Sequence, residues 1–450
     1  MDEKTDKFLI ALIVVISVLR ILSVFTISNN DLIFDESSYM NIARGLTEGL
    51  DYGYIPGERY SDAYRPPVYP LTVSFFFSMF GGNEFVARTV SSVFGVLSIL
   101  VIYFLGKELY GKRIGLLSSL ILSSVPTYWF YSSKALVEGM FIFLVTLFLY
   151  TFYSSLGKKK YMIPAGILLS LIFLTKYTGG VLVVFFVLFI LIWKRDLLKS
   201  KYLYLSLIAA LLTVAPWISF NLRVYGTPFG SGTFLFGKNL GAGMFANFNL
   251  YYLLALVIET SLFLPFIAIG FYTMFKNKDK NFLPFVLLFL IFIIPLSFFE
   301  VKRSRYILGL LPVLTVTAAY SFDQLKKIRI RGMRFRRFVL PLIILLVIVN
   351  GAITVYGFEN YPRSERFKVI PEAGAYLREN CMDKKIYSNV YDYVWWYTHK
   401  ENHPLEEINI SEKNICVLYD FFYASDRFEE EFGRNFETVL DRGKLKIYKN

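Results

Sequence analysis

Histidine and cysteine are almost absent from this chain of 450 residues, which contains two of each. The two histidines, His399 and His403, flank Glu401 at a spacing in which a metal site is conceivable. Pro404 and the polar surroundings favour an exposed turn instead. Because no other histidine is present, we expect no zinc site and predict no metal-ligating residues. A divalent cation held by carboxylate oxygens stays open as a cofactor.

The chain also lacks internal repeats and low-complexity tracts. No cleavable signal peptide is expected, because the first apolar run is long enough to span a membrane and has no small-residue cleavage site. The two cysteines, Cys381 and Cys416, both lie near the C-terminal end. A disulfide and a pair of buried free thiols both stay open for them.

Apolar residues are abundant, at 55% of the chain, and aromatic residues make up 18%. With repeated apolar runs of near twenty residues, this composition predicts a polytopic α-helical membrane protein. The segments at 162–176 and 179–193 are short and are separated only by Tyr177 and Thr178. We expect about eleven transmembrane helices, at residues 8–27, 85–106, 114–131, 136–155, 162–176, 179–193, 203–220, 250–275, 282–299, 306–323 and 338–356.

The positions of lysine and arginine predict the orientation of these helices. If the N-terminus is cytoplasmic, every even-numbered connection is basic, and the alternate ones are acidic or poor in charge. The net charge of +13 then belongs to the cytoplasmic rim and its anionic lipids, and we expect no nucleic-acid partner. The sequence therefore predicts a multi-pass protein of the plasma membrane with its C-terminus outside.

The composition changes after Tyr356, where no further spanning run occurs. We therefore divide the chain into a membrane domain, residues 1–356, and a soluble extracytoplasmic domain, residues 357–450. Alternating patterns in the second domain predict a small α/β fold. The expected elements are helices near 371–380 and 425–433 and strands near 385–390, 415–419, 436–440 and 445–448. Trp395-Trp396-Tyr397 is interpreted as buried aromatic residues.

The first outer loop, residues 28–84, is acidic, with eight Asp or Glu against three Arg and no Lys. It opens on Asp35 and Glu36, directly after the first spanning segment. Carboxylates at the edge of a bilayer are costly to dehydrate, so they often mark a functional site. The alternative is that the pair caps a helix at the membrane surface.

Nearly all other charges outside the cytoplasmic loops fall in the outer half of the predicted helices, which favours a polar cavity that opens outward. Snorkelling is the alternative for Arg20, Arg88 and Lys134, helix capping for Glu84, and an internal ion pair for Glu259. The remaining members of this set are Glu138, Lys176, Arg303 and Arg305.

Several short motifs occur in order along the predicted outer side. They are Asp35-Glu36-x-x-Tyr39 with Ile42-Ala43-Arg44, Arg65-Pro66-Pro67-x-Tyr69-Pro70, Glu84-Phe85-x-Ala87-Arg88, Ala135-x-x-Glu138, Leu174-Thr175-Lys176 and Arg305-Tyr306-x-Leu308. Together they resemble the GT-C glycosyltransferases, in the branch of protein O-mannosyltransferases and lipid A aminoarabinose transferases. Two positions depart from the pattern: the family usually has Asp where Glu138 stands and Gly where Tyr177 stands.

The resemblance implies transfer of a sugar from a polyprenyl phosphate to a protein, lipid or glycan acceptor at the outer membrane face. Asp35 would be the general base, with Glu36 and Glu138 as further catalytic carboxylates. Lys176, Arg303 and Arg305 would hold the donor phosphate. Substrate binding would fall to Tyr39, Arg65, Glu84, Arg88, Glu259 and Tyr306. A transporter or flippase of lipid-linked sugars is the alternative function, although such proteins usually show internal repeats.

Overall fold

The computed structural model describes residues 3–27, 32–33, 35–54, 63–232, 248–326, 329–330, 333–334, 336–360, 365–409, 411–420, 436–442 and 445–450. The chain forms two compact units. The first comprises Met1–Phe25, Pro66–Tyr69 and Arg88–Glu359, and the second comprises Thr26–Arg65, Pro70–Ala87 and Asn360–Asn450. Apart from Pro66–Tyr69, the first outer loop thus belongs to the same unit as the C-terminal segment.

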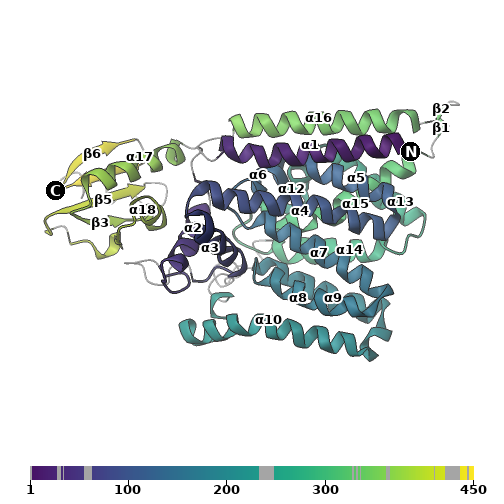
Figure 1. Cartoon of the computed structure of the whole chain (residues 1–450), viewed down its shortest axis with the longest axis horizontal. Helices are drawn as coiled ribbons and strands as arrows, with labels where there is room; N and C mark the ends of the chain where they lie inside the picture. The colour runs from purple at the N-terminus through teal and green to yellow at the C-terminus, as the bar shows by residue number, and fades with distance from the viewer. Residues whose placement is uncertain are drawn as a thin grey trace. The chain divides into compact units, whose positions relative to one another are not determined.

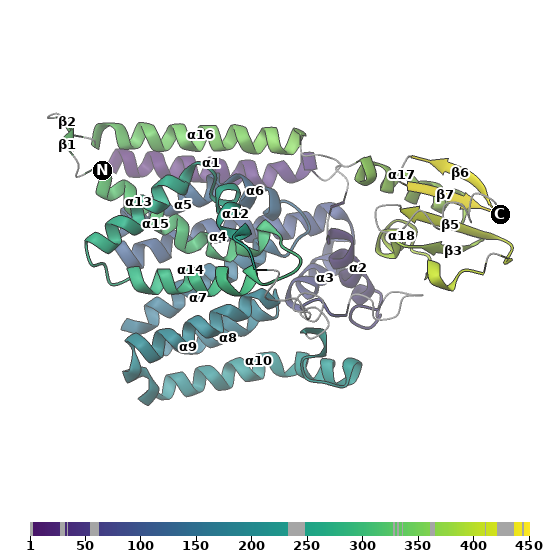
Figure 2. The ribbon, with the colours of Figure 1, turned by 180° about the vertical axis from the view of Figure 1, so that it is seen from behind.

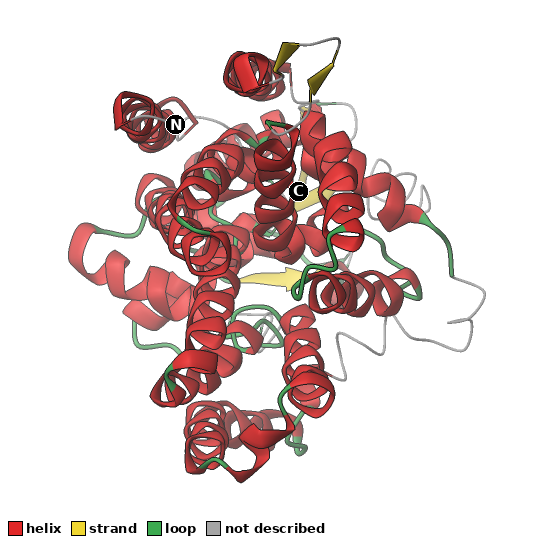
Figure 3. Cartoon of the chain, turned by 90° about the vertical axis from the view of Figure 1, so that its right-hand side faces the viewer, coloured by secondary structure: helices red, strands yellow, loops and turns green. Residues whose placement is uncertain are grey.

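The first unit is a bundle of apolar helices that run along one common direction (Figures 1 and 2). Many of them are seen end-on when the chain is turned by a quarter (Figure 3). The α-helices are α1 (Glu3–Ile27), α4 (Glu84–Tyr110), α5 (Lys112–Ser124), α6 (Pro126–Ser132), α7 (Glu138–Gly157), α8 (Met162–Phe173), α9 (Val181–Trp193), α10 (Lys201–Tyr225), α12 (Tyr251–Thr260), α13 (Leu264–Lys276), α14 (Phe282–Ser297), α15 (Leu311–Leu325) and α16 (Arg336–Asn360). Short 3₁₀ segments are η1 (Lys159–Tyr161), η2 (Tyr177–Gly180), η3 (Arg195–Lys199), η4 (Ser261–Phe263) and η5 (Ser304–Leu310).

The prediction of a polytopic helical membrane protein is confirmed, and each of the eleven predicted segments coincides with helix. Seven helices in the described part of the chain are long and apolar enough to cross a membrane, or eight if the bent pair α5–α6 counts as one span. Two predicted helices are interrupted. The segment 114–131 bends by 67° between α5 and α6, and the segment 250–275 breaks at Ser261, whose φ of 49° is left-handed.

Close packing of the helices requires glycine at two contacts. A Cβ atom on Gly166 of α8 would lie 2.4 Å from the carbonyl oxygen of Ser206 in α10. A Cβ atom on Gly270 of α13 would lie 2.3 Å from the carbonyl oxygen of Thr317 in α15. In a membrane, lipid tails are as apolar as the helix side chains, so helices associate through close packing. Small residues let the helix backbones approach closely enough for it.

Arg20 of α1 donates hydrogen bonds to backbone carbonyl groups at the α5–α6 bend. Arg20 is 2% exposed, and its guanidinium donates to the carbonyl oxygens of Ser123, at 3.4 Å, and Tyr128, at 3.1 Å, and to the hydroxyl of Ser132. It also lies 4.4 Å from the centre of the Tyr128 ring. A helix bend frees carbonyl groups that the apolar surroundings cannot hydrogen-bond. Arg20 is thus a buried structural donor, and the snorkelling interpretation is wrong for it.

We therefore expect Arg20→Met to destabilise the protein by about 2 kcal/mol, because at least two buried carbonyl groups lose a charged donor. The measurement is thermal unfolding of the detergent-purified protein. Lys7→Gln, at an exposed position of the same helix, is the matched control and should melt like the wild type. An Arg20→Met protein with an unchanged melting temperature would show that the bend needs no donor.

The second unit combines helices of the first outer loop with a small α/β fold. The loop contains α2 (Glu36–Thr47) and continues into α3 (Val68–Phe80), and the C-terminal segment adds α17 (Glu365–Asn380) and α18 (Tyr391–Thr398). The strands are β3 (Lys385–Ser388), β4 (Asn402–Pro404), β5 (Ile415–Asp420), β6 (Glu437–Asp441) and β7 (Leu445–Lys449), with the 3₁₀ segment η6 (Leu405–Glu407) after β4. A separate pair of short strands, β1 (Arg329–Ile330) and β2 (Met333–Arg334), lies in a basic connection of the first unit.

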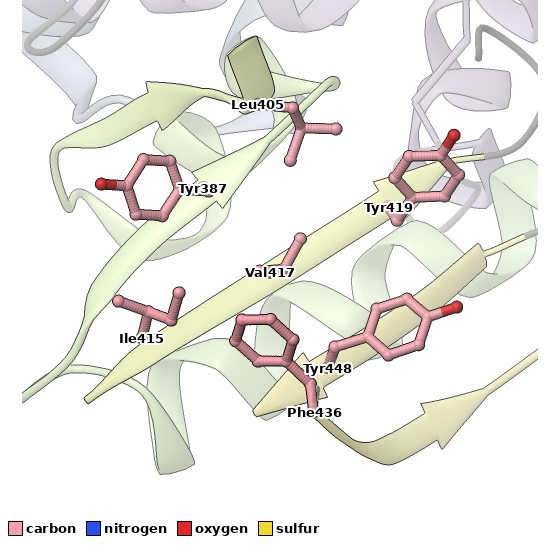
Figure 4. Packing of buried hydrophobic residues seen from close by; sticks show 7 residues of the cluster. All are labelled: Tyr387, Leu405, Ile415, Val417, Tyr419, Phe436 and Tyr448. Atoms are coloured by element: carbon pink, nitrogen blue, oxygen red, sulfur yellow. The ribbon is translucent and has the colours of Figure 1, made fainter. Parts of the chain in front are cut away.

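The five strands form one sheet in the order β4-β3-β5-β7-β6. The pairs β3/β4 and β3/β5 are parallel, and β7 is antiparallel to both β5 and β6. Alternate residues of β5, namely Ile415, Val417 and Tyr419, point to one face and join a buried apolar cluster (Figure 4). Tyr387 of β3 and Tyr448 of β7 complete this core from the neighbouring strands.

The predicted small α/β domain is confirmed, with some differences in detail. All four predicted strands are present, whereas α18 and β4 were not predicted, and the predicted helix at 425–433 lies outside the described residues. Cys381 and Cys416 form a disulfide that joins the end of α17 to β5. His399 follows α18 in a left-handed conformation, whereas His403 lies in β4 rather than in a turn. Among the described residues, no group of three or more His, Cys, Asp or Glu could hold a metal ion.

Candidate active site

Asp35 stands immediately before α2, but its side chain makes no capping hydrogen bond to that helix. Instead Asp35 Oδ1 lies 3.3 Å from both terminal nitrogens of Arg65. The aspartate side chain is 31% exposed, whereas that of Arg65 is 11% exposed. Arg65 also donates to the Ser38 hydroxyl at 3.0 Å and lies 5.1 Å from the centre of the Tyr39 ring. Arg65 therefore fixes a carboxylate that still faces solvent.

Glu36 has a different environment from its neighbour. It is completely buried, and its Oε2 accepts a hydrogen bond of 2.8 Å from the backbone N–H of Ile33. The Glu36 N–H in turn donates to the Ile33 carbonyl oxygen at 3.2 Å. This reciprocal pair holds the chain as it enters α2. The two adjacent carboxylates thus divide into an exposed one and a structural one.

The C-terminal helix α18 supplies Asp392, which sequence reasoning missed, to the same unit. Its Oδ2 accepts hydrogen bonds from Ser37, at 2.7 Å, and from Ser38, at 3.0 Å. Its carbonyl oxygen accepts one of 2.6 Å from the amide of Asn41. Ser38 therefore lies between Arg65 and Asp392, and one face of α2 is fixed by residues more than 350 positions away.

Trp396, one turn further along α18, holds Arg44 and Glu84. The Arg44 guanidinium lies 3.6 Å from the centre of the Trp396 ring and donates to the Trp396 carbonyl oxygen at 2.9 Å. The indole N–H donates to Glu84 Oε1 at 2.7 Å. Burial lowers the pKa of Arg44 to about 10, against the opposing influence of Glu48 and Glu84, so the guanidinium stays charged at neutral pH. Trp396 is buried, as predicted, and it also anchors the loop.

A second cluster lies in the first unit, at points where helices are interrupted. Glu138 begins α7, Lys176 follows the end of α8 in extended conformation, and Arg305 lies in η5. Lys176 Nζ is 3.0 Å and Arg305 Nη1 is 3.5 Å from the same atom, Glu138 Oε1. The carboxylate is 1% exposed, whereas each cation is 12% exposed. One buried carboxylate therefore orients two partly exposed cations.

Glu259, in the last turn of α12, is 1% exposed, and neither of its carboxylate oxygens has a hydrogen-bond partner in the described part of the chain. Glu138 Oε2 is likewise buried without a partner there. Glu259 lies close enough to Glu138 and Lys176 for their charges to interact. Tyr306 extends the cluster, because its ring centre lies 5.3 Å from Lys176 Nζ. Buried carboxylate oxygens of this kind can accept hydrogen bonds from a bound ligand.

The remaining predicted residues have other environments. Arg303 is exposed. The ion pairs of Glu138 among the described residues are with Lys176 and Arg305, not with Arg303. Arg88 and Lys134 are buried in the first unit. The predicted site residues therefore form two groups, one in each unit: Asp35, Glu36, Tyr39, Arg65 and Glu84 in the second, and Arg88, Glu138, Lys176, Glu259, Arg303, Arg305 and Tyr306 in the first.

Comparison with known proteins identifies the fold. Residues 64–220 match the family described as dolichyl-phosphate-mannose-protein mannosyltransferase, a range that includes Arg65, Glu138 and Lys176. The structure of ArnT from Cupriavidus metallidurans bound to undecaprenyl phosphate is similar with a TM-score of 0.75 and 14% identity, over 98% of this chain and 97% of that one. The oligosaccharyltransferase of Archaeoglobus fulgidus is similar with a TM-score of 0.62 and 15% identity, over 96% of this chain and 71% of that one.

An uncharacterized protein of Aquifex aeolicus (strain VF5) is 28% identical over 385 residues, which are 84% of this chain and 83% of that protein. Together these similarities confirm the resemblance to the GT-C glycosyltransferases that the motifs predicted. The chain is a multi-pass membrane protein with the GT-C fold, and it carries a small C-terminal sheet domain.

Proposed function

We propose that this protein is a membrane glycosyltransferase that moves a sugar from a polyprenyl phosphate to a hydroxyl group of a protein, lipid or glycan acceptor. The match to the mannosyltransferase family supports the reaction class. Polyprenyl phosphate as the donor carrier is supported by ArnT, whose similar structure was solved with undecaprenyl phosphate bound.

The convergence of Lys176 and Arg305 on Glu138 is the observation that carries the proposal. In the reaction the acceptor oxygen attacks the anomeric carbon, and the bond from that carbon to the phosphate oxygen breaks. The phosphate leaves with the bonding electrons, so fixed positive charge near it stabilises the transition state. Lys176 and Arg305 are partly exposed, and Glu138 holds both in place. We assign the donor phosphate to these two cations, with Glu138 as the positioning residue and Arg303 as a further contact.

Asp35 is the proposed proton acceptor for the attacking hydroxyl. A general base must be ionised, accessible and held in place. Asp35 meets the last two conditions through its exposure and its contact with Arg65, whose positive charge also favours the ionised carboxylate. Glu36 is buried and bonded to the backbone, so we assign it to the shape of the loop.

The other predicted residues receive proposed roles that follow from their contacts. Tyr39 and Arg65 lie beside Asp35 and would contact the acceptor or the sugar. Glu259 and Tyr306 lie beside Lys176 and would accept hydrogen bonds from the sugar or stack on it. Glu84 is bonded to Trp396 and would position the loop. For Arg88, which is buried, we keep the substrate-binding role that the motif resemblance implies.

We further propose that the first outer loop and the C-terminal domain lie on the extracytoplasmic side of the plasma membrane. Their contacts within one compact unit support a common side. The disulfide between Cys381 and Cys416 supports an oxidising compartment. The basic connections, including Lys158, Lys159 and Lys160, would face the cytoplasm.

This orientation predicts a pattern of cysteine labelling in intact cells. Single cysteines at two exposed positions, Glu48→Cys and Lys413→Cys, should both react with a membrane-impermeant maleimide. Lys159→Cys, exposed in a connection of the predicted cytoplasmic side, should react only after the cells are lysed. Protection of either Glu48→Cys or Lys413→Cys before lysis would overturn the proposed orientation.

The function itself can be tested in cells that carry or lack the gene. Loss of the protein should remove one glycan from a surface protein, lipid or polysaccharide and should cause its polyprenyl-phosphate sugar to accumulate. Mass spectrometry of both fractions measures the two effects and identifies the sugar. Unchanged glycans together with an unchanged donor pool would contradict the proposal.

A further inference from the structure

A cavity of about 490 Å³ lies in the first unit where the ends of four helices meet. It is formed by the last turns of α4, α7 and α9 and by the first turn of α14, which Figure 2 shows within one bundle. Its polar and aromatic lining consists of Glu108, Tyr153, Trp193, Lys194, Lys280 and Asn281.

This cavity is distinct from the candidate active site. Glu138 begins α7, whereas Tyr153 lies fifteen residues further along the same helix. At the usual rise of an α-helix these positions are about 22 Å apart along the axis. The cavity therefore lies at the opposite end of the span, at the basic connections that are proposed to face the cytoplasm.

Two buried polar side chains in the lining have no hydrogen-bond partner in the described part of the chain. Tyr153 is 8% exposed and Asn281 is 3% exposed, and the unpartnered atoms are Tyr153 Oη and Asn281 Nδ2. The nearby Asp279 Oδ1 already accepts hydrogen bonds from Tyr110 Oη, at 2.9 Å, and from the backbone N–H of Asn281, at 2.8 Å. Buried donors without partners are costly, so a ligand with acceptor oxygens would stabilise them.

The rest of the lining indicates what that ligand is. The lining carries two positive charges, from Lys194 and Lys280, and one negative charge, from Glu108, and Asp279 lies nearby. An anionic group would pair with the two lysines, since Asp279 Oδ1 already accepts two hydrogen bonds. Leu109, Phe189, Trp193 and Pro284 supply apolar walls beside them. A phosphate offers acceptor oxygens to both donors and charge to both lysines, and an attached acyl chain would cover the apolar walls.

We propose that this cavity binds the phosphate of a membrane phospholipid head group, as a site separate from the transferase reaction. Tyr153 Oη and Asn281 Nδ2 donate to the phosphate oxygens, and Lys194 and Lys280 neutralise its charge. The lipid then ties together the ends of α4, α7, α9 and α14, of which α9 and α14 belong to no other polar cluster described above.

The experiment is native mass spectrometry of the detergent-purified full chain after exchange into phosphatidylglycerol, with diacylglycerol of the same acyl chains and inorganic phosphate as comparisons. The wild type should retain one phosphatidylglycerol more tightly than the rest and should retain no diacylglycerol. Tyr153→Phe keeps the ring but removes one hydrogen bond to a charged acceptor, so its affinity should fall about tenfold. Lys194→Gln should weaken retention in the same way.

Two controls separate this site from others. Lys159→Gln removes an exposed charge from the same end of the bundle and should retain the lipid. Lys176→Gln alters the proposed donor site and should also retain it, so failure of the proposed function leaves this result unaffected. Equal retention of diacylglycerol would show an apolar cavity only, and equal retention of inorganic phosphate would show a site for the free anion. Either result, or full retention in both Tyr153→Phe and Lys194→Gln, overturns the proposal.

Discussion

Replacing Asp35 with asparagine should slow sugar transfer by about a hundredfold or more, because the attacking hydroxyl loses its proton acceptor. The substitution preserves the size of the side chain and its ability to accept a hydrogen bond from Arg65. Folding and donor binding should therefore change little. The measurement is the initial rate of transfer from a synthetic polyprenyl-phosphate sugar at saturating donor.

Asp51→Asn is the matched control, because Asp51 is an exposed carboxylate of the same loop. It should transfer at the wild-type rate. Arg65→Gln removes the group that holds Asp35 but keeps the carboxylate, so it should lower the rate less than Asp35→Asn. A well-expressed Asp35→Asn protein with near-normal turnover would exclude Asp35 as the base.

Neutralising either cation of the buried cluster should lower kcat/KM for the donor by about a hundredfold, because each one stabilises the negative charge of the departing phosphate. The substitutions are Lys176→Gln and Arg305→Gln. The apparent affinity for the acceptor should change much less, since neither cation is proposed to contact it. Arg305→Lys keeps the positive charge but loses the planar guanidinium, which can donate two parallel hydrogen bonds to a phosphate. Its activity should therefore lie between those of Arg305→Gln and the wild type.

Glu138→Gln tests how the two cations are positioned. The amide oxygen can still accept from Lys176 and Arg305, but the negative charge that holds them is lost, so a smaller loss of about tenfold is expected. Lys199→Gln, which removes an exposed charge elsewhere in the same unit, should leave donor dependence unchanged. Wild-type donor dependence in both Lys176→Gln and Arg305→Gln would reduce the two cations to structural charges.

The fold was largely predictable because apolar runs of spanning length leave few alternatives in a membrane. The breaks at the α5–α6 bend and at Ser261 were not predicted, because both segments keep their apolar character there. A local signal was present, since Pro126 opens α6 and Pro265 lies in the first turn of α13. The bend between α5 and α6 also has a tertiary partner, because Arg20 of α1 donates to the carbonyl oxygens of Ser123 and Tyr128. The helix α18 was missed because Tyr391–Thr398 is short and rich in aromatic residues, which favour strands.

The candidate site was predictable as a set of residues but not as an arrangement. Acidic and basic side chains near helix ends could be identified one by one, because charge is rare and costly there. Asp392 and Trp396 gave no such signal, since a carboxylate and a tryptophan in a soluble domain are ordinary. Their contacts with α2 join segments more than 350 residues apart, which no local pattern encodes.

In the proposed reaction, this chain breaks the bond between a sugar and a polyprenyl phosphate. The most direct measurement uses the purified protein in liposomes with a synthetic polyprenyl-phosphate sugar, and with membranes of cells lacking the gene as the source of acceptor. We predict release of free polyprenyl phosphate together with an equal amount of transferred sugar, and loss of both in Asp35→Asn. Movement of the intact lipid-linked sugar between leaflets, with no free polyprenyl phosphate formed, would contradict the account and identify a flippase.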